Sequence, residues 1–290
     1  MVQSEARDFN LPVTHSMHVG FEPATLLAKA DVVIVLESVV PWIAGAHGPR
    51  RDAKVIQIVG DPLASRYPFR EMEADLLVTG DPRAALEEMA ARRKKLIETV
   101  RDQTPVHPAW LAHCLNQVKA ENAIVVSELG VPVSGLDLTQ PRSFMGSLLS
   151  GGLGFGMGAA LGAKLAAPQR EVIVTVGDGS YMFGNPIPYH YVGRAENLPT
   201  LTIVANNHMW GAVRSATLDV FPDGAAAKAN VMPITQLNPS PDFEKVIGTC
   251  GGRGERVDAP ADLLPALERS FAALRSGTPA MLNVITQGRR

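Results

Sequence analysis

The fold of this chain is decided by two stretches, Val172-Ile-Val-Thr-Val176-Gly177-Asp178-Gly179-Ser180 and Leu201-Thr-Ile-Val-Ala205-Asn206-Asn207-His208-Met209-Trp210-Gly211. Each begins as a short apolar, β-branched run and breaks at once into polar residues and glycine. Two such runs, separated by about one helix and its loops, are typical of parallel strands in a doubly wound sheet. Ligands of these sheets bind beyond the carboxyl ends of the strands, where both polar segments fall. The sequence therefore predicts an α/β fold with a site at these two strand ends.

The residues at the two strand ends suit a metal ion and a phosphate. The Asp178 carboxylate and an amide oxygen of Asn206 or Asn207 are hard oxygen ligands that Mg²⁺ prefers. Gly177 and Gly179 let the backbone approach a ligand, and the amides of Gly179 and Ser180 open the next helix toward a phosphate. Either motif alone is more often a plain turn or loop. Together, each directly after a strand and one crossover apart, they indicate a binding site.

This pairing of Gly-Asp-Gly with Asn-Asn resembles the motif of thiamine diphosphate (ThDP) enzymes. The resemblance continues upstream through Gly151-Gly-Leu-Gly-Phe-Gly156 and downstream to Trp210-Gly-Ala-Val-Arg214. In this form the chain resembles the acetolactate synthase and benzoylformate decarboxylase group over roughly residues 10–285. The resemblance implies a doubly wound ThDP-binding domain at 104–290, preceded at 1–103 by part of a Rossmann-like central domain.

The resemblance also assigns roles to residues of the cofactor site. It implies Mg²⁺ ligation by Asp178, Asn207 and the backbone carbonyl of Met209, with Asn206 bracing the loop. Leu153 would wedge the cofactor into its bent form, although a plain core leucine is the alternative. The full set of implied cofactor-binding residues is Glu128, Leu129, Gly130, Gly151, Gly152, Leu153, Gly177, Asp178, Gly179, Ser180, Asn207, Met209, Trp210 and Gly211.

Substrate-side roles follow from the same resemblance. His47, in the loop after the apolar run Val32–Leu36, would reach the substrate as an acid or base; a surface histidine is the alternative. The helix after the metal loop would build the substrate pocket from Trp210, Ala212, Val213 and Arg214, together with Leu153. Arg214 could pair with a substrate carboxylate or form a structural ion pair instead. Glu128 is a weaker candidate for a catalytic acid.

Composition narrows the remaining function classes. The 290 residues are 46% apolar and 19% charged, and the net charge of −2 gives no electrostatic reason to expect nucleic acid. Cys114 and Cys250 have no CxxC spacing, so we expect neither a disulfide framework nor a zinc site. The first residues are polar and no apolar run approaches membrane-spanning length. We therefore expect no signal peptide, no membrane partner and a cytoplasmic location.

The rest of the chain predicts further elements of two α/β units. Strands are expected at 32–36, 55–59, 74–78, 123–127 and 280–285, and helices after Pro82, at 110–118, within 146–167 and at 261–275. The segment 220–241 is expected to form a long mobile loop. Pro186 and Pro188 interrupt the helix that normally follows the Gly-Asp-Gly motif, and they delay its start to about Tyr189.

These features lead to a functional hypothesis. Family members activate ThDP with a glutamate of a separate pyrimidine-binding domain, and no segment before Val32 is long enough for that domain. We therefore expect the ThDP- and Mg²⁺-binding subunit of a two-component 2-oxo acid decarboxylating carboligase. A separate pyrimidine-domain subunit would supply the glutamate within a hetero-oligomer of two copies of each chain or more. The alternatives are a non-oxidative 2-oxo acid decarboxylase, of the benzoylformate or sulfopyruvate decarboxylase kind, and a non-catalytic scaffold subunit.

Carboligation is favoured over aldehyde release by one departure from the resemblance. Yeast-type pyruvate decarboxylases carry a glutamate six positions after the second asparagine, and this chain has Val213 there, beside Ala212. An apolar wall without a proton donor favours transfer to a carbonyl acceptor. A plain nucleotide-binding module is disfavoured, because the chain contains no GxxxxGK[ST] loop and no strand-linked GxGxxG.

Overall fold

The computed structural model describes residues 24–36, 42, 48–59, 74–146, 152–229 and 231–288. The chain divides into two compact units, Met1–Lys95 and Leu96–Arg290, and the division falls inside helix α2 (Pro82–Val100). The boundary expected after residue 103 stays a prediction. Across the described residues, no helix is long and apolar enough to cross a membrane.

The first unit is built on a small parallel sheet. Its strands β1 (Val32–Leu36), β2 (Lys54–Val59) and β3 (Leu76–Thr79) pair in that order, and helix α1 (Ala24–Leu27) precedes them in the chain. All three correspond to expected strands. Helix α2 begins as its sequence indicates: the Asp81 carboxylate accepts the N–H of Arg83 at 2.8 Å, and Pro82 occupies the first turn.

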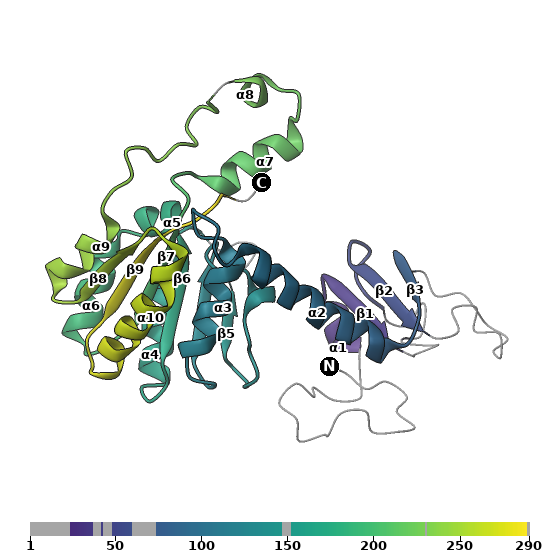
Figure 1. Cartoon of the computed structure of the whole chain (residues 1–290), viewed down its shortest axis with the longest axis horizontal. Coiled ribbons are helices and arrows are strands. Elements are labelled where there is room, and N and C mark those ends of the chain that lie inside the picture. The colour runs from purple at the N-terminus through teal and green to yellow at the C-terminus, as the bar shows by residue number, and fades with distance from the viewer. Residues whose placement is uncertain are drawn as a thin grey trace. The chain divides into compact units, whose positions relative to one another are not determined.

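The second unit is a six-stranded parallel sheet with helices on both faces (Figure 1). Its strand order is β5-β4-β6-β7-β9-β8, so the chain reverses direction across the sheet between β4 and β6. This is the doubly wound architecture that the apolar runs predict. The strands are β4 (Ile124–Glu128), β5 (Phe144–Gly146), β6 (Val172–Gly177), β7 (Leu201–Asn206), β8 (Arg253–Val257) and β9 (Ala280–Ile285).

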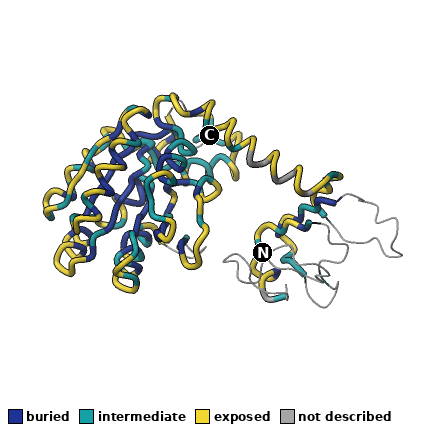
Figure 2. The backbone as a smooth tube through the Cα atoms, turned by 60° about the horizontal axis from the view of Figure 1, so that its bottom comes forward, coloured by how far each residue is buried: buried dark blue, intermediate teal, exposed yellow. Residues whose placement is uncertain are grey.

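Alternating side chains of the strands form a core on each face of the sheet. In β6, Ile173 belongs to the cluster beneath α3 (Pro108–Val118) and α10 (Pro260–Arg275). Val172, Val174 and Val176 belong to the opposite cluster, with residues of α4 (Phe155–Ala166), α6 (Pro186–Ala195) and α9 (Phe243–Val246). Figure 2 shows the buried backbone gathered in the interior of this unit. The central strands are therefore held from both sides.

Three parts of the second unit differ from the sequence prediction. Strands β5 and β8 are short or polar edge strands, which need no continuous apolar run. Helix α5 (Asp178–Phe183) forms directly after β6, and α6 starts afresh at Pro186 after Asn185, whose φ is 51°. The start expected at about Tyr189 is therefore wrong: helix forms from Asp178 of the motif, and the prolines begin a second helix at Pro186.

The segment expected to be a long loop is partly anchored. The segment 220–241 begins at the end of α7 (Gly211–Val220) and contains the short helix α8 (Ala225–Lys228); both helices lie beyond the sheet (Figure 1). Farther along, Met232 and Thr235 are buried, and the Thr235 carbonyl accepts the N–H of Trp210 at 2.8 Å. The 3₁₀ turns η1 (Val133–Gly135) and η2 (Ile247–Cys250) complete the described elements.

Candidate functional site

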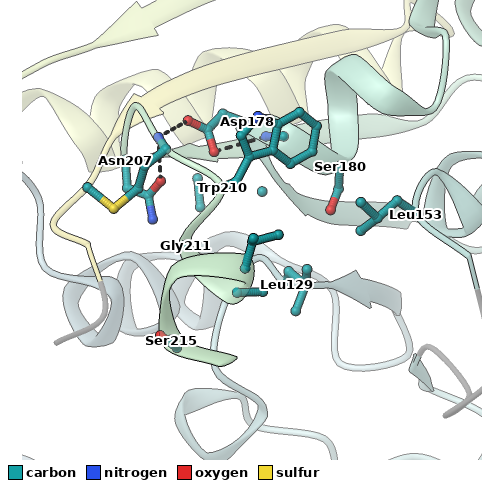
Figure 3. A pocket seen from close by; sticks show the side chains of 14 residues that line it. Leu129, Leu153, Asp178, Ser180, Asn207, Trp210, Gly211 and Ser215 are labelled. Atoms are coloured by element: carbon teal, nitrogen blue, oxygen red, sulfur yellow. Dashed lines mark hydrogen bonds between the residues drawn. The ribbon is translucent and has the colours of Figure 1, made fainter. Parts of the chain in front are cut away.

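A cavity of about 170 Å³ opens at the carboxyl ends of three neighbouring strands, β4, β6 and β7 (Figure 3). Its wall is mostly apolar, with a few polar groups from the two motif segments. The lining residues are Leu129, Leu153, Gly177, Asp178, Gly179, Ser180, Ala205, Asn207, Met209, Trp210, Gly211, Ala212, Val213 and Ser215. The sheet order thus brings together residues that the sequence separates widely, at the place where doubly wound sheets bind ligands.

The side chains of Asp178 and Asn207 converge on one backbone amide. The Met209 N–H is shared between Asp178 Oδ2 and Asn207 Oδ1, each at 3.1 Å. The other carboxylate oxygen, Asp178 Oδ1, accepts the N–H of Gly179 at 3.0 Å. The two oxygen-bearing side chains predicted to ligate Mg²⁺ therefore lie next to one another although they are 29 positions apart in the sequence.

The loop from Asn206 to Gly211 owes its shape to two local turns. His208 has a φ of 59°, and its N–H is accepted by Asn206 Oδ1 at 3.1 Å. Trp210, with φ −72° and ψ 69°, is the centre of an inverse γ-turn in which Gly211 N–H donates to the Met209 carbonyl at 2.8 Å. That carbonyl keeps a second lone pair, so it can also serve as a ligand.

Asp178 is a buried carboxylate, and no basic side chain of the described residues forms an ion pair with it. Its exposed fraction is 2%, and burial raises its pKa to about 6 although the backbone amides that it accepts favour the charged form. A divalent cation would remove this desolvation cost. No group of three His, Cys, Asp or Glu side chains gathers among the described residues, so an ion here would take one carboxylate, one amide and one carbonyl oxygen. That set fits Mg²⁺, which keeps places for water and phosphate.

Ser180 supplies a second sign that a polar ligand belongs in this cavity. Its hydroxyl lines the cavity wall, is buried, and has no hydrogen-bond partner among the residues that the structure describes. Because a buried unpaired hydroxyl is costly, a native one calls for an explanation such as a ligand. A phosphate oxygen is a suitable acceptor, and the residues present therefore fit a diphosphate bound with a divalent metal.

Trp210 packs directly over the second glycine of the Gly-Asp-Gly motif. A Cβ added to Gly179 would lie 2.5 Å from Trp210 Cε3, whereas a Cβ at Gly177 would meet nothing closer than the Leu129 carbonyl at 3.5 Å. Gly179 is thus needed so that the indole can form the cavity wall. This role differs from the close approach of backbone to ligand that the sequence suggests for both glycines.

Comparison with known proteins identifies the family. The model of the thiamine pyrophosphate enzyme C-terminal TPP-binding domain matches residues 131–284, which is more than half of the chain and includes every residue of the cavity wall except Leu129. The chain belongs to the ThDP-dependent enzymes.

Relatives place this ThDP-family chain in the expected group. A probable acetolactate synthase of Mycobacterium bovis is 35% identical over 206 residues, covering 70% of this chain and 35% of that protein. A benzoylformate decarboxylase of Pseudomonas aeruginosa is 27% identical over 301 residues, covering 95% of this chain and 53% of that protein. The structure of a ThDP-dependent 4-hydroxybenzoylformate decarboxylase of Rhodococcus jostii matches with a TM-score of 0.58 and 25% identity, over 96% of this chain and 54% of that one. The chain thus spans between about a third and about a half of the length of these relatives.

Most predicted ThDP-site residues with described positions line the cavity, and four do not. Glu128 lies behind the wall, 2% exposed, and its carboxylate accepts the N–H groups of Gly154 and Gly156 at 2.6 and 2.5 Å. It stabilises the start of α4, where a negative charge is favourable. The others outside the lining are Gly130, Gly152 and Arg214. His47 and Gly151 lie outside the described residues.

Two lining residues of the ThDP-family site were not expected. Ala205 is the last β7 residue before the Asn-Asn pair, and Ser215 lies one helical turn after Gly211 on α7. A helix that begins at Gly211 presents residues four apart on the same side, so the spacing would have indicated Ser215. The roles of all these residues toward a cofactor stay predictions.

Proposed function

We propose that this chain is the ThDP- and Mg²⁺-binding part of a 2-oxo acid decarboxylating carboligase. The observation that carries the proposal is the meeting of Asp178 and Asn207 at the Met209 amide, beside the unpartnered hydroxyl of Ser180. One anionic ligand, two neutral oxygen ligands and a free hydroxyl form a site for a metal-bound diphosphate.

Each part of the cavity has a distinct task in this proposal. Asp178, Asn207 and the Met209 carbonyl hold Mg²⁺, and Ser180 donates to the diphosphate. Leu153, at the cavity wall and 37% exposed, supports the bent form of the cofactor. When bound, ThDP supplies the nucleophilic carbon and the electron sink that allow a 2-oxo acid to lose carbon dioxide. The part of the protein is to bind the cofactor, to orient it and to exclude water from it.

The apolar side of the cavity bears on the outcome of the reaction. Val213 and Ala212 lie on the first turn of α7 and face the cavity without a proton donor of their own. Exclusion of water and acids from this wall favours reaction with a carbonyl acceptor over release of an aldehyde. Carboligation is therefore the first candidate activity.

A decarboxylase is the second candidate. The benzoylformate decarboxylase relative and the 4-hydroxybenzoylformate decarboxylase structure both match 95% or more of this chain, whereas the acetolactate synthase relative matches 70%. The two candidates differ in product, so turnover of a 2-oxo acid with and without an acceptor aldehyde separates them.

The proposal includes a partner. Asp178 is the only ionisable residue among those that line the cavity, and it is assigned to the metal. The glutamate that activates ThDP in this family would then come from a pyrimidine-binding domain, which we propose is a separate subunit in a hetero-oligomer. Three apolar lining residues, Leu129, Leu153 and Val213, are 45%, 37% and 50% exposed and offer such a domain a surface.

The test is retention of ThDP by the purified chain, expressed alone and with candidate partner subunits. We expect binding that requires Mg²⁺, is reversed by a chelator, and is lost in Asp178→Ala. Asp223→Ala removes an exposed acid of the same unit and should bind as the parent does. Wild-type affinity in Asp178→Ala would refute the metal site, and turnover of 2-oxo acids by the chain alone would refute the need for a partner.

A further inference from the structure

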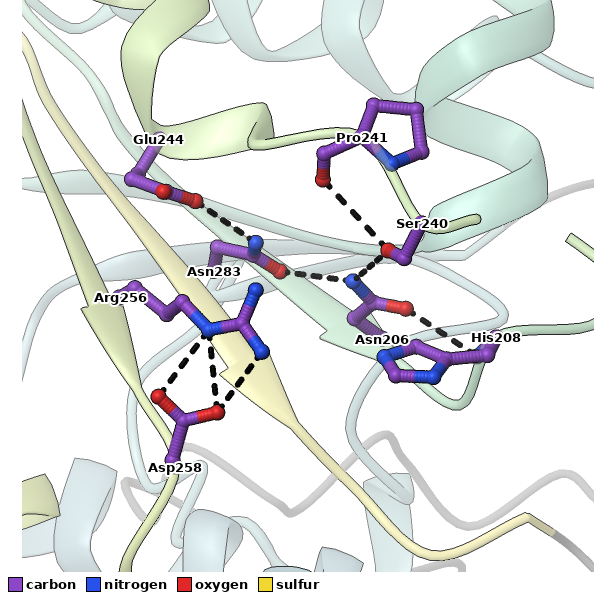
Figure 4. A network of polar contacts seen from close by, with 8 residues as sticks. All are labelled: Asn206, His208, Ser240, Pro241, Glu244, Arg256, Asp258 and Asn283. Carbon is purple, nitrogen blue, oxygen red and sulfur yellow. Dashed lines mark hydrogen bonds and ion pairs between the residues drawn. The ribbon is translucent and has the colours of Figure 1, made fainter. Parts of the chain in front are cut away.

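A row of polar side chains leads from the surface of the second unit to the loop that carries Asn207 and Met209 (Figure 4). Asn206 Nδ2 donates to Asn283 Oδ1 at 3.0 Å, and Asn283 Nδ2 donates to Glu244 Oε2 at 2.8 Å. At the other end, Asn206 Oδ1 accepts the N–H of His208 at 3.1 Å. Three side chains thus connect α9 to the backbone of the predicted metal loop.

The two central members of this row are fully enclosed. Asn206 and Asn283 are both 0% exposed, on neighbouring strands β7 and β9, and both face the side of the sheet that α9 covers. An unpaired amide there would be costly, so every hydrogen bond in the row matters. Asn206 Nδ2 has one more partner, Ser240 Oγ at 2.9 Å.

Glu244 determines which way the two amides point. A carboxylate can only accept hydrogen bonds, so Asn283 must turn its NH₂ toward Glu244 and its oxygen toward Asn206. Asn206 must then turn its NH₂ toward Asn283, which leaves its oxygen for the N–H of His208. With both amides reversed, an NH₂ group would face the His208 N–H and two donors would meet. The acceptor at one end therefore specifies an acceptor at the other.

Helix α9 is held firmly enough to fix Glu244. Phe243 and Ile247, on either side of it, are 3% and 1% exposed and pack into the core. The backbone of β8 comes so close that a Cβ on Gly254 would overlap the Glu244 carbonyl. Nearby, Arg256 forms an ion pair with Asp258 at 2.9 Å, and the charge of Glu244 also contributes to a raised Arg256 pKa. The Glu244 carboxylate is thus held in a defined position, and the Arg256 guanidinium is a cation near it.

We propose that Glu244 is a positioning residue that, through Asn283 and Asn206, holds the metal-binding loop in its ligating conformation. The bond to His208 N–H supports the positive φ of that residue, and this φ places Asn207 and Met209 beside Asp178. Residues behind metal ligands commonly control metal affinity in this way. The link to metal affinity rests on the proposed function, whereas the link to loop structure does not.

The first experiment compares Glu244→Gln with Glu244→Met by hydrogen exchange of the 206–211 segment in the full chain without ligand. Gln can still accept from Asn283, so exchange at His208 and Met209 should stay within about twofold of the parent. Met has similar length but offers only a weakly accepting sulfur, so exchange should accelerate by about tenfold or more. Glu268→Met, at an exposed position on α10, is the matched control and should leave the segment unchanged.

A second pair of variants tests the orientation without removing a polar group. Asn283→Asp sets two carboxylates against each other and should loosen the loop. Adding Glu244→Gln supplies an NH₂ group that donates to the new carboxylate at position 283, so this one hydrogen bond reverses relative to the parent. The carboxylate at position 283 still accepts from Asn206 Nδ2, which keeps the Asn206 oxygen toward the His208 N–H, so the parent's exchange rates should be recovered. Unchanged loop protection in Glu244→Met, equal losses in Glu244→Gln and Glu244→Met, or no recovery in the double variant would overturn the proposal.

Metal affinity is the separate second readout. In Mg²⁺-dependent ThDP binding, Glu244→Met should weaken the apparent Mg²⁺ affinity by about 10- to 100-fold, and Glu244→Gln should not. Failure of the parent to bind ThDP would refute the proposed function and leave the exchange result standing. Loosened exchange with wild-type Mg²⁺ affinity would overturn the role toward the metal.

Discussion

Alanine should destabilise the protein at the second glycine of the Gly-Asp-Gly motif, Gly179, and have little effect at the first, Gly177. At Gly179 the added methyl would lie 2.5 Å and 2.6 Å from Trp210 Cε3 and Cζ3, so the indole must retreat to about 3.4 Å. Overpacking of this kind costs about 1–3 kcal/mol. Gly179 lies in α5, where alanine regains roughly 0.5–1 kcal/mol of helix propensity. The expected net loss is therefore about 1–2 kcal/mol of unfolding free energy, measured without ligand.

Gly177→Ala is the matched control. The nearest atom to its new methyl is 3.5 Å away, and its φ of −72° and ψ of 157° suit alanine. We expect a change within about 0.5 kcal/mol. Urea denaturation gives both values, and thermal melting should show a fall of about 2–8 °C for Gly179→Ala alone.

The cause of the loss can be assigned by a double-mutant cycle. Trp210→Leu removes the ring that the new methyl strikes, so Gly179→Ala in that background should become neutral or slightly stabilising. Trp210 fluorescence, observed with Trp42 and Trp110 replaced by Phe, should change in Gly179→Ala and stay constant in Gly177→Ala. Equal costs at the two glycines, or a Gly179→Ala cost that persists without Trp210, would refute the packing argument.

Three other changes test further parts of the second unit. Burial lowers the pKa of His190 to about 4 from 6.5, so the unfolded state binds more protons between these values and stability falls as the pH falls through this window. His190→Gln, whose amide can either donate to or accept from the Tyr181 hydroxyl, should flatten that slope in urea titrations by up to about 1.4 kcal/mol per pH unit. Glu128→Gln turns an NH₂ group toward the N–H of Gly154 or Gly156 and should lower the free energy of unfolding by about 1–3 kcal/mol in the same assay. An unchanged free energy of unfolding would show that the carboxylate does not stabilise the start of α4. Val213→Glu places a proton donor in the cavity wall and should raise the ratio of aldehyde to ligated product by about tenfold or more. Chromatography of the products of the active assembly measures this ratio, and an unchanged ratio would show that residue 213 does not control which product forms.

The central strands and the polar turns that follow them could be predicted from the sequence, because the residue patterns that specify them are local. Val172–Gly177 and Leu201–Asn206 are continuous apolar runs bounded by residues that break a strand, and both form central strands. Asp178 and Asn207 could be expected to meet because neighbouring parallel strands end at the same edge of a sheet. The edge strand Arg253–Val257 escaped prediction, since an edge needs only one buried side and its residues are mostly polar.

The sequence by itself thus determined the fold class, the ThDP family and the two strand ends where the candidate site lies, because short-range pattern and residue chemistry specify them. Only the tertiary structure decided that Trp210 covers Gly179 and that Glu244 reaches Asn206 through Asn283. Asn206 and Asn283 are 77 residues apart, and they touch because β9 inserts between β7 and β8. Strand order depends on how both faces of the whole sheet pack against helices, so it cannot be predicted from the local spacing of residues.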